Sequence, residues 1–135
     1  MPIKFPSPEW LNALNEKLNT DERYAKIAAK WEGDLVLVFE PTGNLKEKLY
    51  YYLDPWHGKC RRVEVLQGLE GLKPALVATA TYDNMVRILT GKLDPMSAMM
   101  TRKLQIHGNM ALVMRNIPTV LDLVRCAREC VDEIL

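Results

Sequence analysis

Histidine and cysteine are the residue types in this sequence most able to act as nucleophiles or to bind a metal. Cys126 and Cys130 stand four residues apart, so on a helix they would share one face and could bind a metal together with His107. Zinc sites generally use closer cysteine pairs, however, and these two cysteines continue an apolar stripe. His57 lies in a predicted turn, and neither histidine has a neighbour that forms a known nucleophile arrangement. We therefore expect no catalytic residue, no metal and no cofactor. A thiol or metal-dependent enzyme that uses these residues stays open as an alternative.

Methionine is concentrated in one stretch of the chain. Residues 93–114, LDPMSAMMTRKLQIHGNMALVM, contain five of the seven methionines. These methionines recur at spacings of three and four, which places them on helix faces on either side of a short extended segment. Methionine adapts to irregular apolar shapes because its side chain has three flexible bonds and a soft sulfur. From the residues alone, a pocket for an apolar ligand and an ordinary core explain this stripe equally well.

The first part of the sequence reads as helices followed by strands. Ser7 and Pro8 predict the start of a helix, because serine is a good N-cap and proline is favoured in the first turn. A second helix should begin near Thr20. Short apolar runs between turn residues then predict strands at 34–40, 47–54, 58–66 and 75–82.

Helices return around the methionine-rich stretch. Asp83 is expected to cap a helix that ends at Gly91, and residues 94–95 should open another. Alternating polar and apolar residues at 103–107 predict a half-buried strand, and the final helical stretch should be interrupted at Pro118. Together the elements predict an α+β fold in which helices pack over one face of a largely antiparallel sheet.

Length and composition narrow the class of protein. The 135 residues favour a single domain over 1–135, and 48% hydrophobic with 26% charged residues are ordinary globular values. A formal charge of +1 argues against a nucleic-acid binder. No apolar run is long enough for a membrane span, and three cysteines without a secretion signal suit reduced thiols, so we expect a cytoplasmic protein.

Residues 82–116 carry an ordered series of short motifs. They are Gly-Lys-Leu at 91–93, Asp-Pro at 94–95, Lys-Leu-Gln-Ile at 103–106 and Gly-Asn-Met at 108–110. In this order and spacing the segment resembles the sterol carrier protein 2 family of lipid-binding domains. The strand-rich residues 34–82 also fit the family in order and length.

The resemblance implies an about five-stranded sheet with a hydrophobic tunnel between the sheet and its helices. Such a tunnel would hold a fatty acid, a fatty acyl-CoA, a sterol-like lipid or an isoprenoid. Carried over by position, the ligand-binding residues would be Met85, Leu89, Met96, Met99, Met100, Leu104, Ile106, Met110, Met114, Leu121 and Val124.

The sequence departs from the family pattern at positions that bear on the ligand's polar end. Thr101-Arg102 replaces a usual Gln-Gly, Ala111 a frequent glycine, and Arg115-Asn116 a glutamine-bearing segment. Arg102, Lys103 and Arg115 are candidates to meet an anionic head group at the tunnel mouth.

Two function classes follow from these observations. The first is a lipid carrier with a small hydrophobic ligand as its partner, no nucleic acid and at most transient membrane contact. The alternative is a non-catalytic interaction or accessory module of a lipid-metabolising enzyme complex, with the exposed side of residues 49–54, LYYYLD, meeting a partner. A homodimer or an enzyme partner is compatible with either class.

Overall fold

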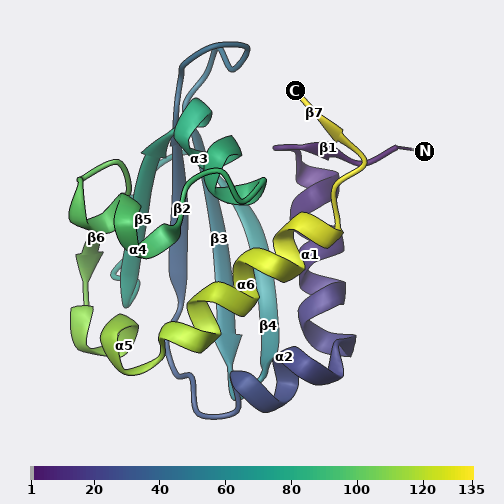
Figure 1. Ribbon diagram of the computed structural model, residues 1–135, viewed down its shortest axis with the longest axis vertical. Coiled ribbons are helices and arrows are strands. Elements are labelled where there is room, and N and C mark those ends of the chain that lie inside the picture. The colour runs from purple at the N-terminus through teal and green to yellow at the C-terminus, as the bar shows by residue number, and fades with distance from the viewer. Residues whose placement is uncertain (1) are drawn as a thin grey trace.

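The computed structural model describes residues 2–135, and its centre is a mixed sheet covered on one face by helices (Figure 1). The α+β class and the five strands are confirmed. The strands run in the order β4-β3-β2-β5-β6. They are β2 (Leu35–Glu40), β3 (Leu49–Trp56), β4 (Lys59–Leu66), β5 (Leu76–Thr81) and β6 (Gln105–Gly108).

The sheet is largely antiparallel, as predicted, and contains one parallel pair of neighbouring strands. β2 pairs in parallel with β5, whereas β2–β3, β3–β4 and β5–β6 are antiparallel. The parallel pair forms because the chain leaves β4 at one edge and returns on the far side of β2, so the strands do not continue as a simple meander. This return places β5 beside β6, the strand of the methionine-rich stretch.

The helices begin largely where local capping signals predict. They are α1 (Pro8–Thr20), α2 (Glu22–Ile27), α3 (Tyr82–Leu89), α4 (Pro95–Met100), α5 (Met110–Arg115) and α6 (Ile117–Glu129). Ser7 Oγ accepts a hydrogen bond from the Trp10 amide at 3.1 Å, and Asp94 Oδ2 accepts one from the Ser97 amide at 3.0 Å. Within residues 2–135, no helix is both long enough and apolar enough to cross a membrane.

The start of α3 differs from the prediction. Thr81, and not Asp83, is its N-cap, with its hydroxyl accepting from the Asn84 amide at 3.2 Å. β5 runs into α3 without a loop, so the last extended residue takes the capping position. At the other end of the helical region, α5 and α6 are separated at Asn116 with Pro118 in the first turn of α6, as predicted.

The turn between β3 and β4 is shorter than the sequence suggests. Pro55 and Trp56 still belong to β3, and only His57 and Gly58 turn the chain, with φ of 49° and 78°. A Cβ on Gly58 would lie 2.6 Å from the Ala25 carbonyl oxygen. Glycine therefore permits both the backbone conformation and the close packing of this turn on α2.

The two chain ends form a small separate sheet that the sequence did not predict. β1 (Lys4–Phe5) pairs in parallel with β7 (Glu133–Ile134), and Figure 1 shows both strands beside the start of α1. This pairing carries Phe5 into the main core, where only 3% of its surface is exposed.

Adjacent residues of β3 face opposite sides of the sheet, as expected for a strand. Tyr51 packs in the main core beneath the helices, whereas Tyr52 joins Val36 and Val38 on the other side. Arg62 lies over the Tyr52 ring at 4.5 Å and helps to cover this second cluster. The helices therefore enclose one face only, and the space between that face and the helices is where a cavity occurs.

Candidate ligand cavity

A cavity of about 150 Å³ lies in the main core between the sheet and the helices. β2 supplies alternate residues Leu35, Leu37 and Phe39, because every second side chain of a strand points to the same face. α6 supplies residues at helical spacing. The full lining is Phe5, Trp10, Leu14, Trp31, Leu35, Leu37, Phe39, Leu53, Leu76, Ala78, Met85, Ile88, Leu89, Pro95, Met99, Leu104, Ile106, Val113, Val120, Leu123, Val124 and Ala127.

The lining is free of charge: among the described residues, no charged side chain contributes to it. The two indole nitrogens among the lining residues are already occupied. Trp10 Nε1 donates to the Ala127 carbonyl at 3.0 Å, and Trp31 Nε1 donates to the Gly33 carbonyl at 2.8 Å. The cavity therefore offers dispersion contacts and shelter from water, and no group that would solvate an ion or act as an acid or base.

An open groove adjoins the cavity on the side of α4 and β6. It is lined by Met99, Arg102, Leu104, Gln105, Ile106, His107 and Met110. Met99, Leu104 and Ile106 line both spaces, so these three side chains lie between the partly polar groove and the apolar cavity. Arg102 adopts a left-handed conformation, with φ of 60°, at the end of α4.

The structure brings six of the eleven predicted ligand-binding residues to the cavity wall. These are Met85, Leu89, Met99, Leu104, Ile106 and Val124. Met110 lines the groove only. Contact of any of these residues with a ligand stays a prediction.

Four of the predicted residues line neither space. They are Met96, Met100, Met114 and Leu121. Met96 is half-buried, and Met100 is 86% exposed. Met96 and Met100 lie outside both spaces because α4 is six residues long and buries Pro95 and Ala98 instead. Met114 on α5 and Leu121 on α6 are exposed.

Of the three residues predicted to meet a head group, only one lies at either space. Arg102 lines the groove, whereas Lys103 and Arg115 are exposed and line neither the groove nor the cavity. His107, which was not among the predicted ligand-binding residues, also lines the groove.

The aromatic part of the cavity was missed as a site. Phe5, Trp10, Trp31 and Phe39 all line it, and none of them was among the predicted ligand-binding residues. No sequence signal separates them, because a cavity-lining side chain and a core side chain have the same apolar periodicity.

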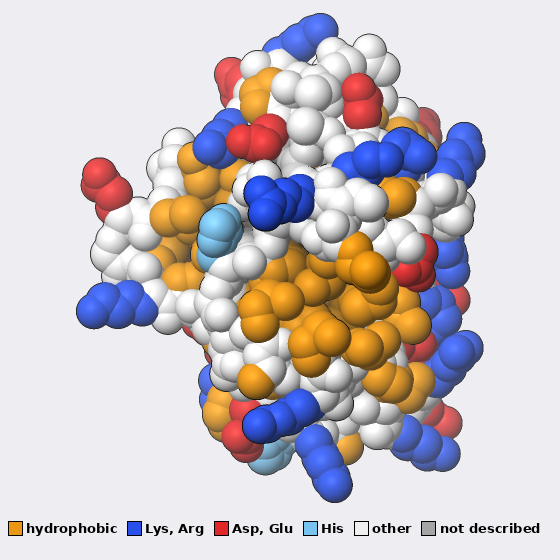
Figure 2. Space-filling model, turned by 60° about the vertical axis from the view of Figure 1, so that its left-hand side comes forward, with side chains coloured by type: hydrophobic (Ala, Val, Ile, Leu, Met, Phe, Trp, Pro, Cys, Tyr) orange, Lys and Arg blue, Asp and Glu red, His pale blue; other side chains and the backbone are white. Residues whose placement is uncertain are grey.

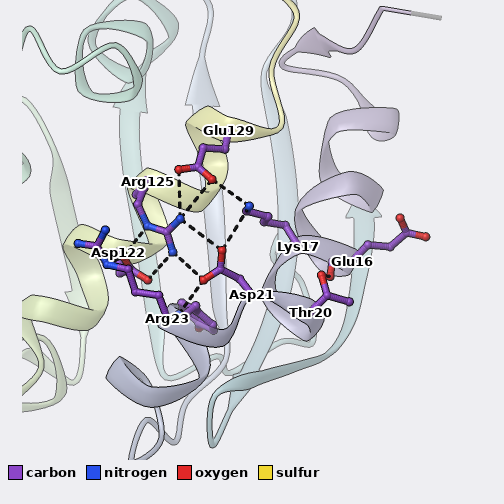
Figure 3. A network of polar contacts seen from close by, with 9 residues as sticks. Glu16, Lys17, Thr20, Asp21, Arg23, Asp122, Arg125 and Glu129 are labelled. Carbon is purple, nitrogen blue, oxygen red and sulfur yellow. Dashed lines mark hydrogen bonds and ion pairs between the residues drawn. The ribbon is translucent and has the colours of Figure 1, made fainter.

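Beside the cavity, α6 is tied to α1 and α2 by a network of charged groups (Figure 3). Arg125 Nε donates to Asp122 Oδ1 at 2.7 Å, and its Nη2 donates to Asp21 Oδ1 at 2.8 Å. Glu129 accepts from Arg125 at 3.1 Å and pairs with Lys17 at 2.9 Å. The network fixes the helix that supplies Val120, Leu123, Val124 and Ala127 to the cavity.

The network also shifts the ionisation of its members. The Arg125 guanidinium, helped by the Tyr24 amide, holds the pKa of Asp21 well below its usual range. Hydrogen bonds to Asp122 and Asp21 raise the pKa of Arg125 further above its usual value. Asp21 and Arg125 therefore stay ionised at neutral pH.

The same location contains the one cluster within residues 2–135 that could supply three metal ligands, formed by Asp21, Asp122 and Cys126. The Arg125 guanidinium already binds both carboxylates, and its positive charge opposes a cation there. Burial raises the pKa of Cys126 to about 11, and burial also raises the pKa of Cys130. A protonated, buried thiol is a poor nucleophile, which weighs against the thiol-enzyme alternative.

Comparison with known proteins adds independent findings. The model of the SCP-2 sterol transfer family matches residues 11–120. The crystal structure of sterol carrier protein 2 has a TM-score of 0.79 and 32% identity over 89% of this chain and 94% of that one. The solution structure of a conserved protein from Thermus thermophilus has a TM-score of 0.82 and 31% identity, over 93% of this chain and 88% of that one.

A more distant structure shares the fold alone. It is the solution structure of palmitated sterol carrier protein 2 like 2 from Aedes aegypti, with a TM-score of 0.60 and 15% identity over 87% of this chain and 94% of that one. Among curated protein sequences, none matches this chain significantly.

Proposed function

Because this chain belongs to the SCP-2 sterol transfer family, we propose that it is a lipid carrier that encloses the hydrocarbon part of its ligand in the apolar cavity. The candidate ligand classes are a fatty acid, a fatty acyl-CoA, a sterol-like lipid and an isoprenoid. The observation that carries the proposal is a cavity in the main core whose lining is apolar throughout.

Energetics favour occupation of this cavity. An unfilled volume of about 150 Å³ costs on the order of 4 kcal/mol at about 24 cal/mol per Å³. That is a large share of the roughly 5–15 kcal/mol by which a domain is stable. Each buried methylene of a ligand contributes about 0.8 kcal/mol, so hydrocarbon would offset the cost of the cavity.

The cavity must widen for a long ligand. A volume near 150 Å³ accommodates about one benzene-sized group. Met85 and Met99 lie in the wall, and their flexible side chains can change rotamer at little cost. The proposed carrier therefore adapts its α3–α4 side to the length of the chain that it binds.

The polar end of the ligand should lie in the groove. The described residues that line the cavity include no charged side chain, and burying an unpaired carboxylate there would be strongly unfavourable. Arg102 and His107 line the groove that shares three residues with the cavity wall. A carboxylate at this position would meet Arg102 while its hydrocarbon chain extends inward.

The first test is to identify what the purified protein carries. Extraction into organic solvent, analysed by mass spectrometry beside a native mass spectrum of the intact protein, should release about one lipid per chain. A protein that is isolated empty and takes up no fluorescent fatty acid, sterol or isoprenoid would contradict the proposal.

A matched pair of variants tests the place of binding. Val124→Trp fills the cavity from α6 and should abolish uptake of a fluorescent fatty acid from solution, since Val124 lines the wall. Leu121→Trp, one turn earlier on the same helix, adds the same side chain at an exposed position and should bind as the unmodified protein does. Equal binding by both variants would place the ligand elsewhere.

A further inference from the structure

The exposed hydrophobic side chains of this protein are unevenly distributed. Within residues 2–135, seven large hydrophobic side chains are exposed, and four of them lie between residues 100 and 121. These four, here called the methionine face, are Met100 (86% exposed), Met110 (39%), Met114 (57%) and Leu121 (42%). Figure 2 shows a broad apolar area on the side of the molecule that is turned forward, with Lys and Arg side chains and some Asp and Glu side chains at its margins.

The methionine face is continuous with the approach to the cavity. Met110 belongs to both the face and the groove, and the groove shares Met99, Leu104 and Ile106 with the cavity wall. A surface that covered the face would therefore also cover the groove. A ligand could then pass between that surface and the cavity without contact with bulk water.

The charges on this part of the chain have one sign. Residues 95–121 contain Arg102, Lys103 and Arg115 and no aspartate or glutamate. All three basic side chains are exposed, and none takes part in an ion pair within residues 2–135. By contrast, Arg61 and Arg125 are paired with carboxylates. Residues 95–121, which supply the whole lining of the groove, are therefore complementary to an anionic surface.

We propose that the methionine face is a membrane-docking surface that seats the groove on an anionic lipid bilayer. Unbranched, flexible methionine side chains can enter a fluid interface that has no fixed shape, while the basic side chains meet lipid phosphates and carboxylates. The proposal rests on the proposed lipid-carrier function, because docking gives the cavity direct access to its ligand.

The charge pattern favours a bilayer over a second copy of this chain. Two copies joined through the methionine face would bring Arg102, Lys103 and Arg115 of each against the same groups of the other. Like charges brought together in this way repel, and the segment supplies no carboxylate to compensate them. An anionic bilayer meets the same groups with opposite charge.

Co-sedimentation with lipid vesicles tests the apolar part of the surface. The protein should bind vesicles of phosphatidylcholine mixed with phosphatidylserine, and Met100→Glu combined with Met114→Glu should weaken binding about tenfold or more, because two carboxylates replace inserted apolar groups. The control is Val65→Glu combined with Leu69→Glu, which changes two exposed hydrophobic residues outside the face and should leave binding unchanged. Equal binding by the two double variants would overturn the proposal.

A second pair of variants tests the charges. Lys103→Gln combined with Arg115→Gln should weaken binding to the phosphatidylserine vesicles about tenfold, since each basic group near an anionic surface contributes several-fold to binding. Added salt should have a similar effect. The control, Lys48→Gln combined with Arg62→Gln, alters cations that lie over tyrosines of β3 and should have little effect. A loss no larger than that of the control would also overturn the proposal.

Uptake of a fluorescent fatty acid from solution separates this proposal from the carrier function. The Met100→Glu, Met114→Glu variant should bind the fatty acid normally, since neither residue lines the cavity or the groove, and should exchange it with vesicles more slowly. If the unmodified protein takes up fatty acid but does not bind the vesicles, the carrier function stands and the docking proposal is overturned. The methionine face would then suit a protein partner. An unmodified protein that binds the vesicles but no lipid from solution contradicts the carrier function alone.

Discussion

The cavity is bounded on one side by aromatic rings and on the other by short elements with flexible side chains. The aromatic wall consists of Phe5, Trp10 and Phe39, none of which is more than 3% exposed. Phe5 packs edge-on against Trp10, with ring centroids 4.7 Å apart, and against Phe39 at 5.7 Å. Such rings have few rotamers and well-defined contacts, so this wall is rigid.

The opposite wall, here called the α4–β6 wall, consists of Met99, Leu104 and Ile106. All three are half-buried, and all three also line the open groove. α4 has six residues and β6 has four, and β6 lies at the edge of the sheet. If the protein carries a lipid as proposed, we expect ligand entry and widening of the cavity on the α4–β6 side, while the aromatic side stays in place.

Replacing one residue in each wall tests most directly whether the aromatic wall is more rigid than the α4–β6 wall. This test has the largest expected effect. Trp10→Ala should lower the free energy of unfolding by about 3–5 kcal/mol, because it removes a fully buried ring. Met99→Ala should cost well under half as much, since Met99 is half-buried in an adaptable wall. Urea unfolding of both variants measures the difference, and similar losses would show that the two walls are equally rigid.

A substitution in the ion network tests what keeps α6, a third side of the cavity, in place. Arg125→Met should lower the free energy of unfolding by about 2–3 kcal/mol, because Asp122, only 3% exposed, and Asp21 both lose their hydrogen bonds to the guanidinium and keep only their ion pairs with Arg23 and Lys17. Arg61→Met is the control: it breaks an ion pair whose arginine is 53% exposed, and it should cost less than about 1 kcal/mol. Equal losses would mean that the network does not hold the helix.

The pH dependence of stability should report the same network with a smaller effect. The pKa of Asp21 is held below its ordinary value of 3.8 by Arg125, so the ionised carboxylate stabilises the folded state. That contribution is present above the ordinary pKa and is lost as the pH falls through and below that value. Unfolding midpoints measured from neutral to acidic pH should fall more steeply for the unmodified protein than for Arg125→Met. Parallel curves would contradict this origin of the acid sensitivity.

The smallest expected effect concerns Arg102 in the groove beside the α4–β6 wall. Arg102→Gln should weaken fatty-acid binding about fivefold, as expected for loss of one partly exposed charge-assisted hydrogen bond. Binding of a fatty alcohol of the same length should not change, because the alcohol carries no charge. Arg115→Gln, outside the groove, should change neither affinity when both ligands are titrated by fluorescence. Equal weakening of acid and alcohol by Arg102→Gln would assign Arg102 a role in shape rather than in charge recognition.

Local signals in the sequence predicted much of this fold. Ser7 and Asp94 cap helices, and Pro118 lies in the first turn of the helix that follows a break, as expected from neighbouring residues alone. The motifs within residues 82–116 led to the family that the comparisons support. The cavity was predicted in part, since Met85 and Met99 line it.

Other features needed the folded chain. The parallel pairing of β2 with β5 depends on where the chain crosses the sheet, and the pairing of β1 with β7 joins residues at the two ends of the sequence. Met100 and Met114 share the apolar character and helical spacing of Met99, yet they face outward.

The sequence by itself determined the α+β class, most helix starts, the family motifs and the concentration of methionine near one site. Caps, turns and periodicity involve residues only a few positions apart, so they can be read from the chain directly. The tertiary structure decided that Phe5 and Trp10 face a cavity and that the methionines divide between its wall and the outer surface. Whether an apolar side chain meets a cavity, a packed neighbour or water depends on segments distant in the sequence, because burial is a property of the assembled layers.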